Sequence, residues 1–287
     1  MTHIIDGKEI AQQFKQDMAA QIKQNNLSPG LAVILVGQDP ASEVYVRNKA
    51  NSAKEIGIHS ITIRMPEETT QRDLISKINE LNEDDNVHGI LVQLPLPKHL
   101  DVQEVIMAIS PEKDVDGFHP MNVGRLYAGI EGFVPCTPRA CMILLSHVMP
   151  DLTGKKALVI GRSNIVGKPV AQLLLQANCT VTLAHSKTVN LAHECQEADI
   201  VIAAVGIPHF VKGSWVKDGA VVIDVGINRI TNPEDTTKTK LVGDVDFEEA
   251  AKKASAITPV PGGVGPMTIA CLLANTIDSA IRHSNKL

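Results

Sequence analysis

Short apolar runs alternate with segments of helical pattern along most of this chain. Residues 31–36 (LAVILV) and 89–94 (GILVQL) are such runs in the first half, and residues 157–160 (ALVI) open a second series. Continuous apolar runs of this length are typical of parallel strands that are buried on both faces of a sheet. Parallel strands are joined by crossover connections, which are usually helices. The alternation therefore predicts an α/β fold with parallel sheets.

The spacing of these runs places the expected elements. Asp39 and Pro40 supply an N-cap and a first-turn proline for a helix that ends near residue 56. Strands are expected at residues 31–36, 60–65, 89–94, 157–160, 180–183, 200–204 and 220–225, and helices at residues 10–24, 40–56, 70–82, 170–176 and 267–283, with one more helix beginning at Cys141. Residues 114–137 are rich in Gly and Pro, which predicts a long functional loop or an interdomain connection.

Composition and charge exclude several classes of protein. The net charge of −5 gives no basic excess for binding nucleic acid. The first residues lack a basic stretch followed by an apolar one, and no apolar run approaches the ~18 residues of a membrane span, so we expect neither a signal peptide nor a membrane segment. The cysteines are scattered without a metal-binding spacing, which predicts reduced thiols, a cytoplasmic protein and no metal site. They are Cys136, Cys141, Cys179, Cys195 and Cys271.

A glycine-containing turn follows the apolar run at residues 157–160. Gly161 and Gly167 lie between that run and a leucine-rich helical segment, an arrangement in which backbone N–H groups and a helix N-terminus bind phosphate. Ser163 stands where a dinucleotide motif has its middle glycine, so an ordinary strand-to-helix turn stays open as an alternative. A nucleoside-triphosphate loop is excluded, because the spacing is one residue too long and Pro169 replaces the Mg²⁺-binding hydroxyl.

The position of this turn divides the chain. Because the turn lies beyond the midpoint of the 287 residues, the residues before it are free to form a separate domain. We expect two α/β domains flanking a cleft, the second being Rossmann-like and dinucleotide-binding. Residues 1–138 are assigned to the first domain and residues 139–287 to the second.

Charge favours one of the two nicotinamide cofactors. NAD sites usually place Asp or Glu about 20 residues beyond the first glycine. No acidic residue occurs between Leu152 and His193, whereas Arg162, Ser186 and Lys187 are available to bind a 2′-phosphate. These side chains could alternatively be solvated surface groups. The missing acid shifts the prediction to NADP.

The first half carries a second group of candidate residues. Tyr45 and Lys49 are four residues apart on one helix face, although an exposed lysine beside a packed tyrosine would give the same spacing. Gln93 lies at the end of a buried strand, and strand ends of this kind are where α/β sheets bind ligands. Asp114 and Asp116 lie in a turn-rich segment, where the simplest role of a carboxylate is to cap a turn.

Together these segments identify a known family. The chain resembles the bifunctional methylenetetrahydrofolate dehydrogenase/cyclohydrolases in the order and spacing of several motifs. They are Tyr45-x-x-x-Lys49, VQLPLP at residues 92–97, DVDGFHP at 114–120, GRSNIVGKP at 161–169 and PVPGGVGPMT at 259–268. The resemblance implies NADP-dependent oxidation of 5,10-methylenetetrahydrofolate and hydrolysis of the product to 10-formyltetrahydrofolate in the same cleft, as part of one-carbon metabolism. It also implies a cytoplasmic homodimer, with the helix at residues 267–284 packed back on the first domain.

The resemblance assigns roles to individual residues. Lys49 is the implied catalytic lysine, oriented by Gln93, while Tyr45 stacks on the folate and Asp116 binds the pterin. Further implied folate-binding residues are Leu94, Pro261, Gly262 and Gly263. The implied NADP-binding residues are Gly161, Arg162, Ser163, Ile165, Val166, Ser186, Gly206 and Ile227.

Two other functions remain open at this stage. The chain could be another NADP-dependent dehydrogenase that uses a lysine as acid and base. It could also be a regulatory protein that senses NADPH without catalysing a reaction. The joint presence of Tyr45, Lys49, Gln93 and Asp116 favours the folate enzyme over both.

Overall fold

The computed structural model describes residues 2–232 and 235–284, and its chain divides into two compact units. The front unit comprises Gln12–Cys136 and the chain from Ile269 on, and the back unit comprises the residues up to Ala11 and Thr137–Thr268. Each unit is an α/β structure around its own parallel sheet, as the alternating sequence pattern predicts.

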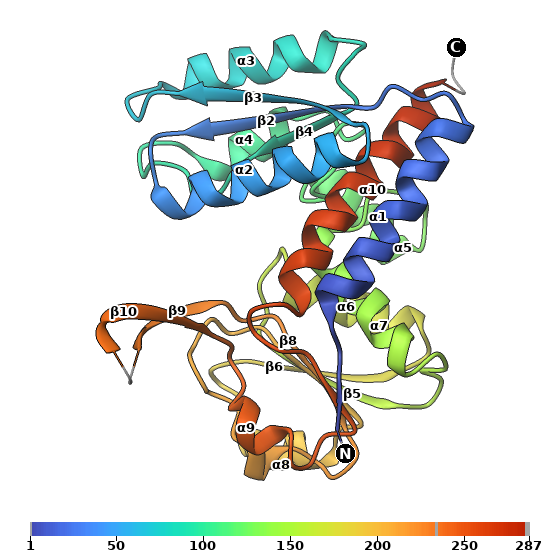
Figure 1. The fold of residues 1–287 in the computed structure, drawn as a ribbon, viewed down its shortest axis with the longest axis vertical. Coiled ribbons are helices and arrows are strands. Elements are labelled where there is room, and N and C mark those ends of the chain that lie inside the picture. The colour runs from blue at the N-terminus through green and yellow to red at the C-terminus, as the bar shows by residue number, and fades with distance from the viewer. Residues whose placement is uncertain (1, 233–234, 285–287) are drawn as a thin grey trace. The chain divides into compact units, whose positions relative to one another are not determined.

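The front unit is built on a three-stranded parallel sheet in the order β3-β2-β4 (Figure 1). The central strand β2 (Gly30–Val36) is buried along its whole length, which explains its unbroken apolar sequence. Ala32, Ile34 and Val36 share a buried cluster with residues of two helices. The other strands are β3 (His59–Met65) and β4 (Gly89–Val92), and the helices are α2 (Pro40–Glu55), α3 (Gln71–Glu83), α4 (Val102–Ala108) and α5 (Pro120–Ala128), with most of α1 (Gly7–Gln24) and of α10 (Val264–Ser284).

Local capping sets the start of two of these helices. Asp39 accepts a hydrogen bond from Ser42 N at 2.7 Å at the start of α2, with Pro40 in the first turn. Thr70 accepts from Asp73 N at 3.2 Å at the start of α3. The predicted helices at residues 40–56 and 70–82 are therefore confirmed to within a residue or two.

The expectation of a long loop at residues 114–137 is wrong, because α5 lies within it. His119 caps this helix by accepting a hydrogen bond from Met121 N at 3.0 Å, and Pro120 occupies its first turn. Gly129 ends the helix in a left-handed conformation with φ of 67°. The proline and glycine that suggested a loop thus mark the two ends of a short helix.

The back unit has a six-stranded parallel sheet in the order β1-β11-β8-β7-β5-β6. The strands are β1 (His3–Ile4), β5 (Lys156–Ile160), β6 (Thr180–Ala184), β7 (Ile200–Ala203), β8 (Val221–Asp224) and β11 (Ala256–Ile257), and the helices are α6 (Cys136–Val148), α7 (Gly167–Gln176), α8 (Leu191–Glu197) and α9 (Phe247–Ala250), with a short 3₁₀ turn η1 (Gly213–Trp215). The sheet, with its crossover helices, is the predicted Rossmann-like arrangement.

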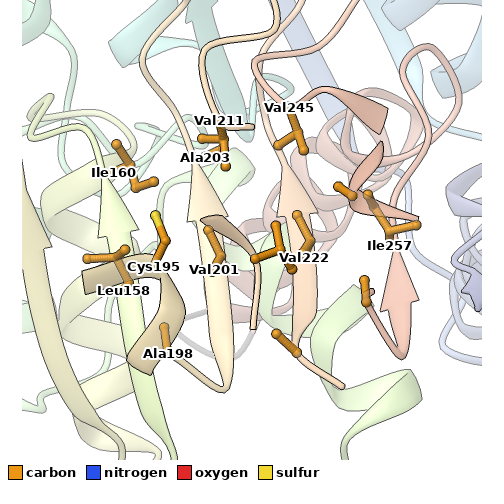
Figure 2. Close-up of a cluster of buried hydrophobic side chains, with 14 of the residues drawn as sticks. Leu158, Ile160, Cys195, Ala198, Val201, Ala203, Val211, Val222, Val245 and Ile257 are labelled. Atoms are coloured by element: carbon orange, nitrogen blue, oxygen red, sulfur yellow. The ribbon is translucent and has the colours of Figure 1, made fainter. Parts of the chain in front are cut away.

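The core of the back unit lies against this sheet. Figure 2 shows Ile160, Ala203 and Val222 from neighbouring strands, with Cys195 of α8 in the same buried cluster. Small and β-branched side chains dominate the cluster, so the helix can lie close to the strands. This packing holds the carboxyl ends of β5, β7 and β8 in fixed positions relative to one another.

Two segments of the back unit differ from the sequence prediction. β1 pairs with β11, which places the first residues with the back unit, whereas the sequence assigned residues 1–138 to a single domain. β9 (Asn228–Asn232) and β10 (Asp235–Val242) form an antiparallel ribbon that the sequence did not indicate. Their sequences are polar and carry no apolar run, so the signal used for the other strands is missing.

The helix α10 is long and apolar enough by length and composition to cross a membrane, but 67% of its most apolar window is buried inside the protein. Its polar residues are used internally as well. Ser279 donates to Glu112 O at 2.9 Å, and Thr276 donates to Leu272 O at 2.9 Å. These are the features of a core helix of the front unit.

Candidate functional site

Lys49 and Gln93 are in direct contact in the front unit. Lys49 Nζ, on α2, donates a hydrogen bond to Gln93 Oε1 at 3.0 Å. Gln93 follows β4, where its backbone N–H donates to Ile34 O at 2.8 Å and its side-chain Nε2 donates to Leu94 O at 2.6 Å. Because the amide nitrogen is already used, the carboxamide oxygen is the atom presented to the lysine. The geometry therefore holds the ammonium or amine group of Lys49 at the carboxyl end of the sheet.

Tyr45 lies one helical turn before Lys49 on α2. Tyr45 is 41% exposed, whereas Lys49 is half-buried. An exposed lysine beside a packed tyrosine, the alternative left open by the spacing, would show the opposite pattern. The ring is thus free to contact a ligand, while the lysine is partly withdrawn from water.

The two acids of the DVDGFHP segment have different surroundings. The buried carboxylate of Asp114 accepts hydrogen bonds from His119 N at 2.8 Å and Phe118 N at 3.2 Å. The Asn122 side chain donates a third, at 2.8 Å. Asp114 therefore caps the turn, and Asp116 remains the candidate for the functional site.

Asp116 is electrostatically linked to Lys49. Burial raises the pKa of Asp116, and the positive charge of Lys49 and a hydrogen bond from the Cys136 thiol oppose that rise. Burial also raises the pKa of Cys136 well above its ordinary value, so this thiol stays protonated and acts as a donor. The structure thus brings Lys49, Gln93 and Asp116 together from α2, the end of β4 and the segment before α5.

The segment that carries Asp116 is anchored by Asn275, which the sequence analysis did not identify. This buried side chain of α10 donates to Val115 O at 2.7 Å and to Val134 O at 3.1 Å. Its position in an apolar helix is the signal that could have revealed it, because an amide in such a place has to find partners. Asn275 ties together two segments that flank the candidate site.

The glycines at residues 161 and 167 are required by close backbone approach. A Cβ on Gly161 would lie 2.1 Å from Ala204 O, and a Cβ on Gly167 would lie 1.9 Å from Gly161 O. Ser163 Oγ accepts from Val166 N at 3.1 Å and from Gly167 N at 3.2 Å, at the start of α7. The turn has the compact shape that a dinucleotide cofactor requires, and a residue larger than glycine would fill it.

The remaining predicted NADP residues lie on exposed loops at the carboxyl ends of the strands. Arg162 and Ile165 are exposed in the turn after β5, and Ser186 is exposed after β6. Thr188 Oγ1 accepts from His185 N at 2.9 Å, which shapes the second loop. The exposed Arg162 guanidinium and Ser186 hydroxyl can bind a phosphate group, and the same exposure fits solvated surface groups.

Two buried acids of the back unit were missed by the sequence analysis. Asp224 ends β8, and Asp244 follows β10. Both are surrounded by backbone N–H donors from the loops that carry Gly206 and Ile227. An acid directly after the apolar run at residues 221–223 was the available signal, since a carboxylate at a buried strand end has to be hydrogen-bonded.

The residues Pro261, Gly262 and Gly263 follow β11 in the back unit. A Cβ on Gly7 would lie 1.8 Å from Gly263 O, so the start of α1 packs directly on this segment. Gly262 has φ of 111°, a backbone conformation that favours glycine. These three residues thus belong to the unit that also contains the glycine turn, whereas the lysine group belongs to the front unit.

Two family models together match most of the chain. Residues 135–284 match the family model "Tetrahydrofolate dehydrogenase/cyclohydrolase, NAD(P)-binding domain", and residues 5–116 match the catalytic-domain model of the same name. A relative called "Bifunctional protein FolD", from Zymomonas mobilis, is 58% identical over 285 residues and covers 96% of each chain.

Solved structures give the same result. The bifunctional enzyme FolD from Campylobacter jejuni has a TM-score of 0.93 and 48% identity, with 100% of both chains covered. The methylenetetrahydrofolate dehydrogenase-cyclohydrolase from Trypanosoma brucei, complexed with NADP cofactor and inhibitor, has a TM-score of 0.94 and 39% identity, covering 100% of this chain and 99% of that one.

Proposed function

Because this chain belongs to the tetrahydrofolate dehydrogenase/cyclohydrolase family, we propose that it oxidises 5,10-methylenetetrahydrofolate with NADP⁺ and hydrolyses the resulting methenyl compound to 10-formyltetrahydrofolate. Both reactions belong to one-carbon metabolism. The observation that carries the proposal is the hydrogen bond from Lys49 Nζ to Gln93 Oε1, with the Asp116 carboxyl group in the field of the same lysine. A regulatory protein that only sensed NADPH would have no use for such a group in its other unit.

Asp116 supplies the recognition of the pterin. A pterin presents adjacent N–H donors along one edge, and a carboxylate can accept two parallel hydrogen bonds from them. Burial raises the pKa of Asp116, while the charge of Lys49 favours its ionised form. Loss of the lysine charge would therefore also weaken the acceptor that holds the substrate.

Oxidation requires geometry more than proton transfer. NADP⁺, when bound, would supply the acceptor for the hydride that leaves the methylene carbon. The carbon becomes cationic, so no base is needed at this step. The exposed ring of Tyr45 stacks on the folate and fixes its plane, and Asp116 fixes its rotation.

Hydrolysis depends on Lys49. Water attacks the methenyl carbon and loses a proton, the bond from that carbon to N5 breaks, and the formyl group stays on N10. Lys49 Nζ accepts one proton of the attacking water and returns it to N5, and the second proton of that water is released to solvent as the carbonyl of the formyl group forms. Gln93 holds Nζ by accepting its hydrogen bond without adding a charge, which leaves the amine able to exchange its proton.

The preference for NADP⁺ is assigned to the loops after β5 and β6. Arg162 would hold the 2′-phosphate by a charge-assisted hydrogen bond and Ser186 by a neutral one. Between Leu152 and His193 the chain offers no carboxylate to repel this phosphate or to bind the 2′-hydroxyl of NAD. The compact turn around Gly161, into which no Cβ fits, supports pyrophosphate binding at the start of α7.

One assay tests the proposal as a whole. Purified protein is given methylenetetrahydrofolate with NADP⁺ or NAD⁺ in parallel, and the absorbances of the reduced nicotinamide and of the methenyl product are followed. We expect reduction with NADP⁺ at least about tenfold faster than with NAD⁺ at equal concentration. No reduction with this folate, but reduction with an amino or hydroxy acid, would establish the alternative dehydrogenase instead.

A cytoplasmic homodimer completes the proposal. Each of the five cysteines is a buried thiol, as in proteins of a reducing compartment. β3 lies at an edge of its sheet, and edge strands offer backbone groups for pairing with a second chain. Sedimentation equilibrium should give twice the monomer mass, and a monomer at micromolar concentration would exclude the dimer.

A further inference from the structure

Asp244 has an unusual set of partners in the back unit. Its carboxylate is completely buried. Oδ2 accepts from Val205 N at 2.6 Å and from Gly206 N at 2.8 Å, and Oδ1 accepts from Ile207 N at 2.9 Å. Three successive backbone N–H groups of the loop after β7 therefore converge on one side chain. Successive N–H groups of this kind form a concave anion site, and here the anion is the protein's own carboxylate.

The same carboxylate also holds the loop after β8. Asn228 Nδ2 donates to Asp244 Oδ1 at 2.8 Å, directly after Ile227. A Cβ on Gly226 would lie 2.1 Å from Asp244 Oδ1, so this loop approaches the carboxylate as closely as its backbone allows. One side chain thus ties together the loops that follow two neighbouring parallel strands.

Asp224 fixes Asp244 from the other side. The Asp224 carboxylate accepts from Asp244 N at 2.9 Å and from Val245 N at 2.9 Å. A third bond comes from Gly226 N at 3.0 Å. A Cβ on Gly243 would lie 1.8 Å from Asp224 Oδ2, so the backbone before Asp244 is held in place by contact as well as by hydrogen bonds.

We propose that Asp244 is the positioning residue of the NADP⁺ site, because it sets the conformation of the two loops that carry Gly206 and Ile227. This inference rests on the proposed function, in which those two residues bind the cofactor. In α/β sheets, ligands bind at the loops that follow the carboxyl ends of the strands. Asp244 acts through backbone groups and not by touching the cofactor itself.

The chemistry of the contact predicts how the site fails. In Asp244→Asn the side chain keeps one acceptor oxygen, but its NH₂ group faces N–H donors of the loops. At least one of the loop amides then loses its partner, and the loops populate other conformations. NADP⁺ must restore the ordered state when it binds, and its apparent affinity falls by the fraction of molecules in that state.

The experiment compares Asp244→Asn with Asp246→Asn, a matched change two residues further on. The Asp246 side chain makes no cap hydrogen bond at the start of α9. NADPH binding is measured by fluorescence titration, and cyclohydrolase activity is measured on the same preparations without cofactor. We expect the NADPH Kd of Asp244→Asn to rise about tenfold or more while its cyclohydrolase rate stays within about twofold of wild type. Asp246→Asn should match the wild type in both.

Two results would overturn the proposal. An unchanged NADPH Kd in Asp244→Asn removes Asp244 from this role. A loss of cyclohydrolase activity as large as the loss of NADPH affinity shows a general structural effect. If Asp244→Asn does not fold, Asn228→Ala provides the test, because it removes one of the four hydrogen-bond donors to the Asp244 carboxylate. We expect the NADPH Kd of Asn228→Ala to rise threefold to fivefold, about what one hydrogen bond contributes. An unchanged NADPH Kd in this variant refutes the inference. Wild-type protein that binds NADPH but lacks both folate activities would refute the proposed function and leave the binding comparison intact.

Discussion

At the scale of single residues, Lys49 is the side chain on which the two proposed reactions differ most. Lys49→Met keeps much of the apolar stem but removes the group that accepts the proton from water. We expect cyclohydrolase activity to fall by about 10²-fold or more. The loss of absorbance of methenyltetrahydrofolate, corrected for its uncatalysed hydrolysis, measures this rate.

The matched control for this variant is Lys54→Met, an exposed lysine near the end of the same helix. It should hydrolyse the methenyl compound at the wild-type rate. Near wild-type hydrolysis by Lys49→Met would show that another group handles the proton. The hydrogen bond to Gln93 would then be a structural contact only.

Asp116 gives a second residue-scale prediction with a different signature. Asp116→Ala removes the acceptor for the pterin, so both activities should fall together, by at least about tenfold in kcat/KM. NADPH binding should stay unchanged, because the glycine turn lies in the other unit. Unchanged folate kinetics in this variant would contradict the assignment, and steady-state assays at several folate concentrations separate the effects on kcat and KM.

At the scale of elements, α10 anchors the segment that carries Asp116. Asn275→Leu keeps the side-chain size but leaves Val115 O and Val134 O without this donor. Buried carbonyls that lose a partner cost about 1–3 kcal/mol, so the urea midpoint should fall. The KM for folate should rise as well, because the loop before α5 loses its anchor. The exposed Asn51→Leu serves as a control, and wild-type folate kinetics in Asn275→Leu would show that the anchor is not needed.

The elements also show how far the sequence alone could go. Buried strands such as β2 and the cap at Asp39 were predicted, because their signals are local. α5 was missed because Pro120 and Gly129 were interpreted as loop residues and not as helix ends. The bond between Asn275 and Val115 joins residues 160 positions apart, and no local pattern predicts such a contact. No local pattern predicts the hydrogen bonds between Asp244 and the loop after β7 either. Lys49 and Gln93, which were predicted for catalysis, are in hydrogen-bond contact.

At the scale of the whole molecule, buried acids link stability to pH in both units. Burial raises the pKa of Asp114 in the front unit to about 6 and that of Asp224 in the back unit to about 7, from an ordinary value of 3.8. The folded protein thus binds these protons more tightly than the unfolded chain does. Their stabilising contribution is complete below pH 3.8 and is lost as the pH rises through about 6 and 7.

The free energy of unfolding should therefore decrease between pH 6 and pH 8, by about 1 kcal/mol. His88 works in the opposite direction, since burial lowers its pKa and its destabilising effect disappears as the pH rises. The decrease should consequently be steeper in His88→Gln than in the wild type. Urea unfolding at several pH values in this range, followed by circular dichroism at constant ionic strength, measures both slopes. A free energy that rises from pH 6 to pH 8 in both proteins would show that Asp114 and Asp224 are already ionised in the folded state, with their backbone hydrogen bonds outweighing burial.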